Sequence, residues 1–362
     1  MPQDQDAAPP ASLVGSKLIG ELRTALSEGD DRPILIAIHD YPDPDALASA
    51  LALQTLVSSW GIATAIAYGG GIGRPENNAM VKLLDIEMTS FRKLPDLEEF
   101  KGALFTDTQP ASRNQSLPSS VPVLAVIDHH TLGSDASTRR HAAWMSGAKA
   151  ARKPFVDVRT EVGSSSTLAL GYLTAAGMVP DKRLATALFV GVMTDTDSLL
   201  RDATTADIAA YTMLLPLADM QLVYGICRPS LGKDFFRFLN SAMNRTTLYH
   251  HCLIADCGEI TAPDVISTVS DFLIRTDRIA YALAYGVKES RIYLSLRAKP
   301  PQDDATRIIL EAVGRNGRGG GHNLSAGGFV DMTGDTWVEV REMQSRFLQA
   351  ARIFGVPGET LI

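Results

Sequence analysis

The sequence predicts an α/β protein: a doubly wound, mainly parallel sheet in the N-terminal domain, followed by a second, smaller α/β domain. Short apolar runs alternate with helical patterns over residues 33 to 193, as in βαβ units. Two of these runs, Pro33 to Ile38 (PILIAI) and Pro122 to Ile127 (PVLAVI), are apolar throughout, which is typical of strands buried on both faces. A long helical stretch, Tyr211 to Tyr249, precedes a new alternating region.

In chain order, an amphipathic helix is expected over 13–26, after a loose tail at 1–12. Strands follow at 33–38, 63–68, 102–106, 122–127 and 154–158, with helices at 44–60, 167–176 and 181–193. The residues Ser164 to Ser166 can supply an N-cap to the helix at 167–176. In the second domain, strands are expected at 247–255, 279–287 and 291–297, and helices at 263–274, 304–313 and 337–353. The expected boundaries are 13–215 for the first domain, 216–246 for a helical linker and 247–355 for the second domain.

Composition narrows the class of protein. The chain has 362 residues, of which 45% are hydrophobic and 21% charged, enough for two cores. The net charge of −7 disfavours binding to long duplex nucleic acid, but a small anionic substrate needs only a few local arginines. Cys227, Cys252 and Cys257 form no C-x-x-C pair and are expected to be buried hydrophobes.

The N-terminal segment MPQDQDAAPPAS carries acidic residues where a secretory signal has basic ones, which favours a cytoplasmic protein. The longest weakly polar stretch, Ala46 to Val57, is too short to span a bilayer. We therefore expect no membrane segment.

Polar clusters follow the predicted strands. His39, Asp43 and Asp45 come directly after the first strand, in a turn that Pro42 and Pro44 restrict. One imidazole with two carboxylates is a ligand set that suits Mn²⁺ or Mg²⁺. The alternative is a polar turn with a capping aspartate.

Acidic residues also stand at three further places, two of them at predicted strand ends and one at a predicted helix end. Asp107 follows a third strand, and Asp128, His129 and His130 follow a fourth; a helix cap and hydrogen-bonded core histidines are the alternatives. Asp195 and Asp197 end an apolar helix, where carboxylates oppose the helix dipole and need a compensating charge unless that end is solvated. Parallel strands place ligands beyond their carboxyl ends, so a split metal site is expected.

Glycine clusters add a candidate anion site. The cluster comprises Gly319, Gly320, Gly321 and His322, and Gly327 and Gly328 follow it. Such glycines let backbone N–H groups approach an anion closely. Three arginines, Arg297, Arg315 and Arg318, lie nearby in sequence or on an adjacent predicted strand. A structural glycine-rich turn is the alternative. For the cluster Gly69 to Gly73, a flexible turn is favoured over substrate contact.

Taken in order, five segments carry a resemblance: HDYPDPDALAS, the Asp of FTDTQPASR, IDHH, GVMTDT and GRGGGHNLSAGG. The first four resemble the signature motifs of the DHH phosphoesterase superfamily, in its oligoribonuclease and dinucleotide phosphodiesterase branch. The fifth resembles the motif of the DHH-associated C-terminal domain. The match spans residues 33 to 330.

This resemblance implies two Mn²⁺ ions, for which Mg²⁺ or Co²⁺ could substitute. The implied ligands are His39, Asp43, Asp45, Asp107, His129 and Asp195, with Asp107 and Asp195 as the shared ones. His130 would contact the scissile phosphate, and Asp128 would orient the histidines. Arg297, Arg318, the backbone of Gly319, Gly320 and Gly321, and His322 would hold a substrate phosphate from the other domain.

The chain also departs from the family pattern. Asp197 replaces a glycine, Leu199 and Leu200 replace an aromatic residue, and the segment 131–163 is longer than expected and basic. The basic residues are Arg139, Arg140, His141, Lys149, Arg152 and Lys153. They form either a substrate lid or a solvated loop, and the solvated loop is favoured.

The implied activity is hydrolysis of short oligonucleotides, or of linear or cyclic dinucleotides, to mononucleotides, by water activated between two metals. A 3′-phosphoadenosine 5′-phosphate phosphatase and a single-strand exonuclease of the same superfamily are alternatives, and a nucleotide sensor without catalysis is a further one. The partners would be a small nucleotide substrate and, in a homodimer, a second copy. Neither the choice between cyclic and linear substrates nor the preferred base follows from the sequence.

Overall fold

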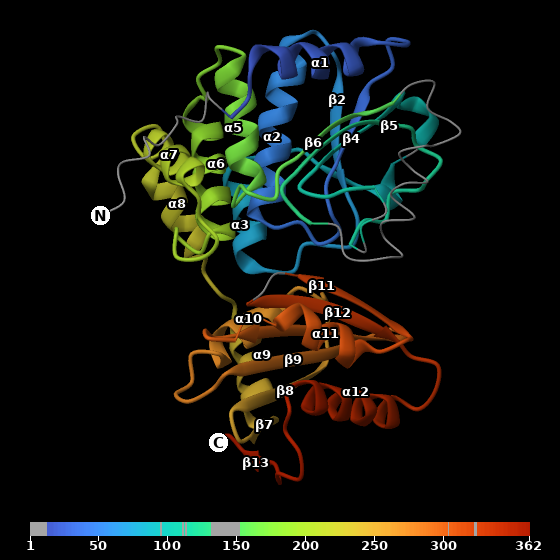
Figure 1. Ribbon diagram of the computed structural model, residues 1–362, viewed down its shortest axis with the longest axis vertical. Coiled ribbons are helices and arrows are strands. Elements are labelled where there is room, and N and C mark those ends of the chain that lie inside the picture. Colours follow the sequence, from blue (N-terminus) through green and yellow to red (C-terminus); the bar gives the residue numbers. More distant parts are fainter. Residues whose placement is uncertain are drawn as a thin grey trace. The chain divides into compact units, whose positions relative to one another are not determined.

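The computed structural model describes residues 13–94, 96–110, 112, 114–131, 153–302, 304–321 and 324–362. The chain divides into two compact units, Met1–Pro229 and Ser230–Ile362 (Figure 1). Each unit is built on its own sheet. Among the described residues, no helix is both long enough and apolar enough to cross a membrane.

The first unit contains a six-stranded sheet in the order β3-β2-β1-β4-β5-β6, in which every neighbouring pair is parallel. The strands are β1 (Ile34–Ala37), β2 (Thr64–Tyr68), β3 (Thr89–Ser90), β4 (Gly102–Thr106), β5 (Val123–Asp128) and β6 (Phe155–Val158). The strand order reverses between β1 and β4. Such a reversal is the topological switch point of a doubly wound sheet, which is where these sheets bind ligands.

One face of this sheet packs against helices. They are α1 (Ser16–Ser27), α2 (Pro44–Ser59), α3 (Pro75–Leu83), α5 (Ser165–Ala175), α6 (Lys182–Asp195), α7 (Thr205–Leu214) and α8 (Met220–Cys227). Alternate strand residues such as Ile34 and Ile36 point into this helical layer, whereas Leu35 and Ala37 face the other side. That side is covered by segments near the short 3₁₀ turns Phe91–Lys93 and Leu97–Glu99 and by loop residues.

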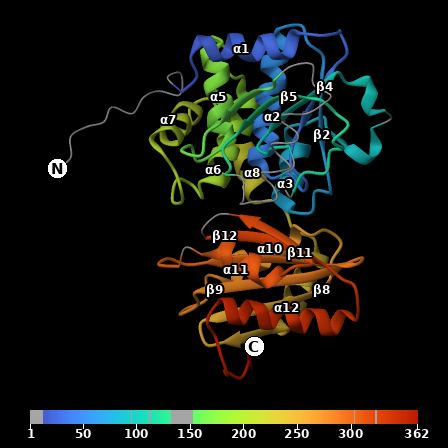
Figure 2. The same ribbon diagram turned by 45° about the vertical axis from the view of Figure 1, so that its right-hand side comes forward.

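The second unit is a seven-stranded sheet between two pairs of helices. Its order is β11-β12-β10-β9-β8-β7-β13, with β8 and β9 parallel and the other pairs antiparallel. The strands are β7 (Thr246–Tyr249), β8 (Cys252–Glu259), β9 (Tyr281–Lys288), β10 (Arg291–Ala298), β11 (Gly317–Gly321), β12 (Ser325–Asp331) and β13 (Glu359–Thr360). The helices α11 (Ala305–Val313) and α12 (Thr336–Ala350) cover one face (Figure 2), and α9 (Lys233–Asn244) and α10 (Val265–Leu273) cover the other.

One prediction in the second unit was wrong. The strand expected over 247–255 is a hairpin of β7 and β8, because His250 turns the chain with a φ of 56°. The glycine cluster, for which a turn was the alternative to an anion site, is strand β11, paired with β12. Gly319 is required there by packing, since a Cβ would lie 2.5 Å from Ile309 of α11.

The stretch expected as a helical linker, 216–246, is shared by the two units. Val223 and Ile226 of α8 are buried in the core of the first unit, and Ala242 of α9 is buried in that of the second. The division falls between Pro229 and Ser230.

Candidate metal centre

The polar clusters meet at the carboxyl ends of three adjacent strands. His39 follows β1, Asp107 follows β4, and Asp128 is the last residue of β5, directly before His129 and His130. Because β4 lies between β1 and β5, Asp107 lies between the other two clusters. This is the switch point of the sheet.

Two groups of possible ligand atoms lie on either side of Asp107. One comprises His39, Asp43 and Asp107, and the other comprises Asp45, His129 and Asp195. A third group comprises Asp107, His129 and His130, and within each of the three groups the ligand atoms lie within 4.8 Å of one another. Oδ2 of Asp107 is 3.4 Å from Nε2 of His39, while Oδ1 is 3.5 Å from Nε2 of His129. The two oxygens of one carboxylate therefore face the two groups.

The separations suit a hard divalent ion. Nε2 of His129 is 3.1 Å from Oδ2 of Asp195, and Nε2 of His39 is 3.6 Å from Oδ1 of Asp43. Neighbouring ligands of an octahedral ion with bonds of about 2.1 Å are about 3 Å apart. The four carboxylates and two imidazoles are also the donor types that Mn²⁺ and Mg²⁺ accept.

The backbone fixes the orientation of two imidazoles. Nδ1 of His39 lies 2.9 Å from the carbonyl oxygen of Asp40, and Nδ1 of His129 lies 3.1 Å from that of Val162. A carbonyl can only accept, so each Nδ1 carries the proton and donates it. In the neutral ring, the lone pair is then on Nε2, which faces the carboxylates.

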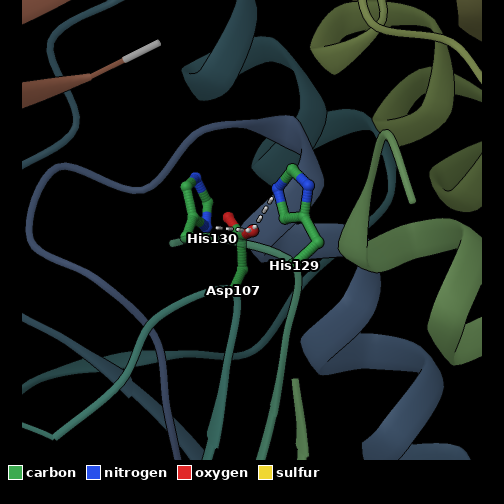
Figure 3. A group of neighbouring side chains, drawn as sticks. All are labelled: Asp107, His129 and His130. Atoms are coloured by element: carbon green, nitrogen blue, oxygen red, sulfur yellow. Dashed lines mark ion pairs between the residues drawn. The ribbon is translucent and has the colours of Figure 1, made fainter. Parts of the chain in front are cut away.

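His130 is held differently from its neighbour. Its Nδ1 is 2.9 Å from Oδ1 of Asp128. The same nitrogen is 3.7 Å from Oδ1 of Asp107 (Figure 3). Gln109 donates from Nε2 to Oδ2 of Asp128 at 2.8 Å and to the carbonyl oxygen of His130 at 2.9 Å. Asp107, His129 and His130 form the third group of possible ligand atoms, so the role of His130 as a substrate contact rather than a ligand stays a prediction.

The aspartates at the helix ends have distinct local roles. Asp43 is the N-cap of α2 and accepts from the backbone N–H groups of Asp45 and Ala46, so capping and a place in the first group coexist. Asp195 is the last residue of α6, as expected, and belongs to the second group. Asp197 is in neither group.

The electrostatics of the ion-free site are strongly perturbed. Burial alone would lower the pKa of His39 and His129, but their contacts with aspartates outweigh it and hold both pKa values well above the ordinary range. Burial, with the nearby charges of Asp107 and Asp195, raises the pKa of Asp45 well above normal. A cation between these carboxylates would remove that repulsion.

Asp107 shows the opposite shift. Burial raises its pKa, but the contacts with His129 and His39 outweigh burial and hold the pKa well below normal. Its backbone lies in the left-handed region with a φ of 55°, an uncommon conformation that aspartate tolerates better than most residues. Asp107 is thus an anion in a constrained backbone position.

Sequence reasoning missed three polar residues of the site. Gln109 follows Asp107 by two positions, and nothing in the sequence distinguishes it from a loop glutamine. Ser164 caps α5 as predicted, but Ser165 and Ser166 also donate their backbone N–H groups to Asp45, at 2.7 and 2.8 Å. In the sequence, the run Ser164 to Ser166 is the one feature that could have indicated these contacts.

The glycines after β2 support the loop after β1. A Cβ on Gly69 would lie 1.7 Å from Oδ1 of Asp40, and one on Gly70 would lie 2.8 Å from the ring of Tyr41. These two positions therefore have no room for a larger side chain beside the residues that follow His39. We assign these glycines a structural role.

The candidate substrate residues of the second unit are on its sheet. Arg297 on β10 donates from Nε to Oδ1 of Asp271 at 2.6 Å, and Arg318 on β11 is exposed. Gly320 has open space where a Cβ would stand. His322 and the basic residues Arg139, Arg140, His141, Lys149 and Arg152 lie outside the described residues, while Lys153 is exposed.

The chain was compared with known proteins. No protein-family model matches it. It is 32% identical over 321 residues to the uncharacterized protein MJ1633 of Methanocaldococcus jannaschii, covering 84% of this chain and 62% of that protein. The chain thus spans less than two thirds of this relative's length.

Solved structures show the fold more fully. An exopolyphosphatase-related protein from Bacteroides fragilis matches with a TM-score of 0.71 at 15% identity, over 94% of this chain and 98% of that one. The chain therefore shares its overall fold with this exopolyphosphatase-related protein. RecJ from Thermus thermophilus, in complex with Mn²⁺, matches with a TM-score of 0.52 at 15% identity, over 98% of this chain and 57% of that one. The expected α/β fold is therefore confirmed.

Proposed function

We propose that this protein is a manganese-dependent phosphodiesterase that hydrolyses short oligonucleotides, or linear or cyclic dinucleotides, to mononucleotides. The observation that carries the proposal is Asp107, whose two oxygens face two separate ligand groups. A bridging carboxylate is what a dinuclear site needs. The likeness to a RecJ structure that contains Mn²⁺ supports manganese as the metal.

His39, Asp43 and Asp107 would hold one ion, and Asp45, His129 and Asp195, with Asp107 shared, would hold the other. Two bound ions about 3.5 to 4 Å apart would make water more acidic and would neutralise charge on the phosphoryl oxygens. The backbone bonds from Nδ1 of the two ligand histidines hold the rings in place before any ion binds. The chain thereby presents a largely preformed set of donors.

His130 would act on the substrate. Burial and the neighbouring His129 lower the pKa of His130, but the bond to Asp128 and the charges of Asp128 and Asp107 together outweigh both, so the pKa is raised. An imidazolium is therefore favoured, with its Nδ1 proton held by Asp128 and its Nε2 proton available for a phosphate oxygen or the departing oxygen. Gln109 keeps Asp128 in the position that this role requires.

The second unit would bind a substrate phosphate. The residues assigned to this phosphate are Arg297, Arg318, His322 and the backbone of Gly319, Gly320 and Gly321. Arg318 is exposed and Gly320 has no side chain to block approach of an anion. Nε of Arg297 donates to Asp271, and Nη1 donates to the carbonyl oxygen of Leu296 at 3.1 Å. These contacts orient the guanidinium, as phosphate recognition requires.

A hydrolysis panel with added Mn²⁺ tests the proposal. It should include cyclic dinucleotides, their linear products, short RNAs, short single-stranded DNA and 3′-phosphoadenosine 5′-phosphate. We expect dinucleotides and short RNAs to be cleaved to mononucleotides, and EDTA to abolish cleavage. Preference for 3′-phosphoadenosine 5′-phosphate or for DNA would favour the alternative enzymes, while nucleotide binding without any turnover would favour a sensor.

A further inference from the structure

Helix α5 begins beside the two groups of ligand atoms. The hydroxyl of Ser165 donates to Oδ1 of Asp107 at 2.9 Å, and the backbone N–H of the same residue donates to Oδ2 of Asp45 at 2.7 Å. Ser165 is fully buried. One residue thus contacts two carboxylates of the site.

The hydroxyl contacts only one of the two oxygens of Asp107. That oxygen, Oδ1, faces His129, whereas Oδ2 faces His39. A carboxylate oxygen has two lone pairs, so a hydrogen bond on one directs the other. The Ser165 hydroxyl therefore sets the direction in which Asp107 meets the group of Asp45, His129 and Asp195.

Asp207 fixes the position of Ser165 by accepting hydrogen bonds from residues before and after it in the sequence. This aspartate of α7 is fully buried and accepts from the backbone N–H of Gly163 at 2.9 Å, the hydroxyl of Thr167 at 2.6 Å and the backbone N–H of Thr204 at 2.9 Å. Gly163 and Thr167 lie on either side of Ser165 in the sequence. The start of α5 is consequently held without help from an ion.

We propose that Ser165 is a positioning residue that orients the shared carboxylate of Asp107 for the second ion, the one held by Asp45, His129 and Asp195. The inference rests on the proposed dinuclear site. Removing a partner that orients a ligand typically weakens metal binding by about 10- to 100-fold. Because Ser165 touches only Oδ1, the loss should fall on one ion.

The test uses Ser165→Ala, with Ser166→Ala as the matched control. Ser166 is equally buried, but its hydroxyl has no hydrogen-bond partner among the described residues, and alanine keeps its backbone N–H. Mn²⁺ binding to the intact chain without substrate is followed by calorimetry, and spin coupling between the ions by electron paramagnetic resonance. We expect two ions in the wild type and in Ser166→Ala, and a second ion about 10- to 100-fold weaker, with reduced coupling, in Ser165→Ala.

The outcomes separate the two proposals. A wild-type chain that does not bind two ions overturns the dinuclear site itself. Two tight ions in folded Ser165→Ala, or the same loss in Ser166→Ala, overturn the role of Ser165 alone. If Ser165→Ala does not fold, Ser165→Cys serves instead: its thiol keeps the shape but is a weak donor, so the same selective loss is expected, and two tight ions would contradict the role.

Discussion

The bond between Asp128 and His130 can be tested by Asp128→Asn, a change that keeps the shape and removes the charge. Gln109 donates to Oδ2, so the amide oxygen of asparagine must occupy that position to avoid two donors facing each other. The amide nitrogen would then face Nδ1 of His130, which would have to accept. The imidazolium would lose its stabilising partner, and the ring would become neutral, with its one remaining proton on Nε2.

The size of the effect follows from the contact that is lost. A hydrogen bond to a charged group contributes about 1.5 to 3 kcal/mol. If this stabilisation acts in the transition state, kcat should fall by about 10- to 150-fold, since about 1.4 kcal/mol corresponds to a factor of ten. The affinity for Mn²⁺ should change little, because Asp128 lies in neither proposed ligand set.

The assay is kcat at saturating Mn²⁺ and substrate, together with metal content and thermal stability. Asp157→Asn is the control, because Asp157 is also buried and accepts from Arg159 and from the hydroxyl of Tyr172, each at 2.7 Å, but belongs to no ligand group. We expect the control to lose stability without losing turnover. An unchanged kcat in Asp128→Asn, or loss of the ions, would refute the reasoning.

Three further predictions concern the metal and the substrate. Asp107→Ala should abolish activity and reduce Mn²⁺ content, measured by elemental analysis; full activity with both ions would contradict the bridging role. His39 and His129 have raised pKa values without ions, so each ion must displace an imidazole proton, and affinity per ion should rise about tenfold per pH unit until pH exceeds those pKa values. Calorimetry at several pH values checks this, and a flat profile would count against it. Arg297→Ala should raise KM by about 10-fold or more while both ions remain, as expected for a lost contact to a charged group; loss of metal would show that its assignment is wrong.

The sequence predicted the first sheet well because its strands are short apolar runs with clear ends. The strand expected at 102–106 is β4, and β1, β2, β5 and β6 each differ from the expected strand by one residue at one or both ends. The two-residue edge strand β3 was not predicted. The clusters around His39, Asp107 and His129 follow from the same fact, since parallel strands bring their carboxyl ends to one edge. The position of Asp195 at a helix end was predicted, but its approach to His129 depends on how α6 packs in the fold.

The remaining features depend on contacts between distant residues. Gln109 and Ser165 are common polar residues whose partners, Asp128 and Asp107, lie 19 and 58 positions away. The strand β11 was missed because glycine is depleted in strands, and the contacts that require glycine there, such as that of Gly319 with Ile309, are made with residues outside the strand. The hairpin at His250 depends on a non-glycine residue with positive φ, which a sequence pattern does not reveal.

The dinuclear site is tested most directly by anomalous X-ray diffraction at the manganese edge from crystals grown with Mn²⁺. We expect two peaks about 3.5 to 4 Å apart on either side of the Asp107 carboxylate, with His39 at one ion, His129 at the other and His130 at neither. A single peak, or a peak liganded by His130, would contradict it.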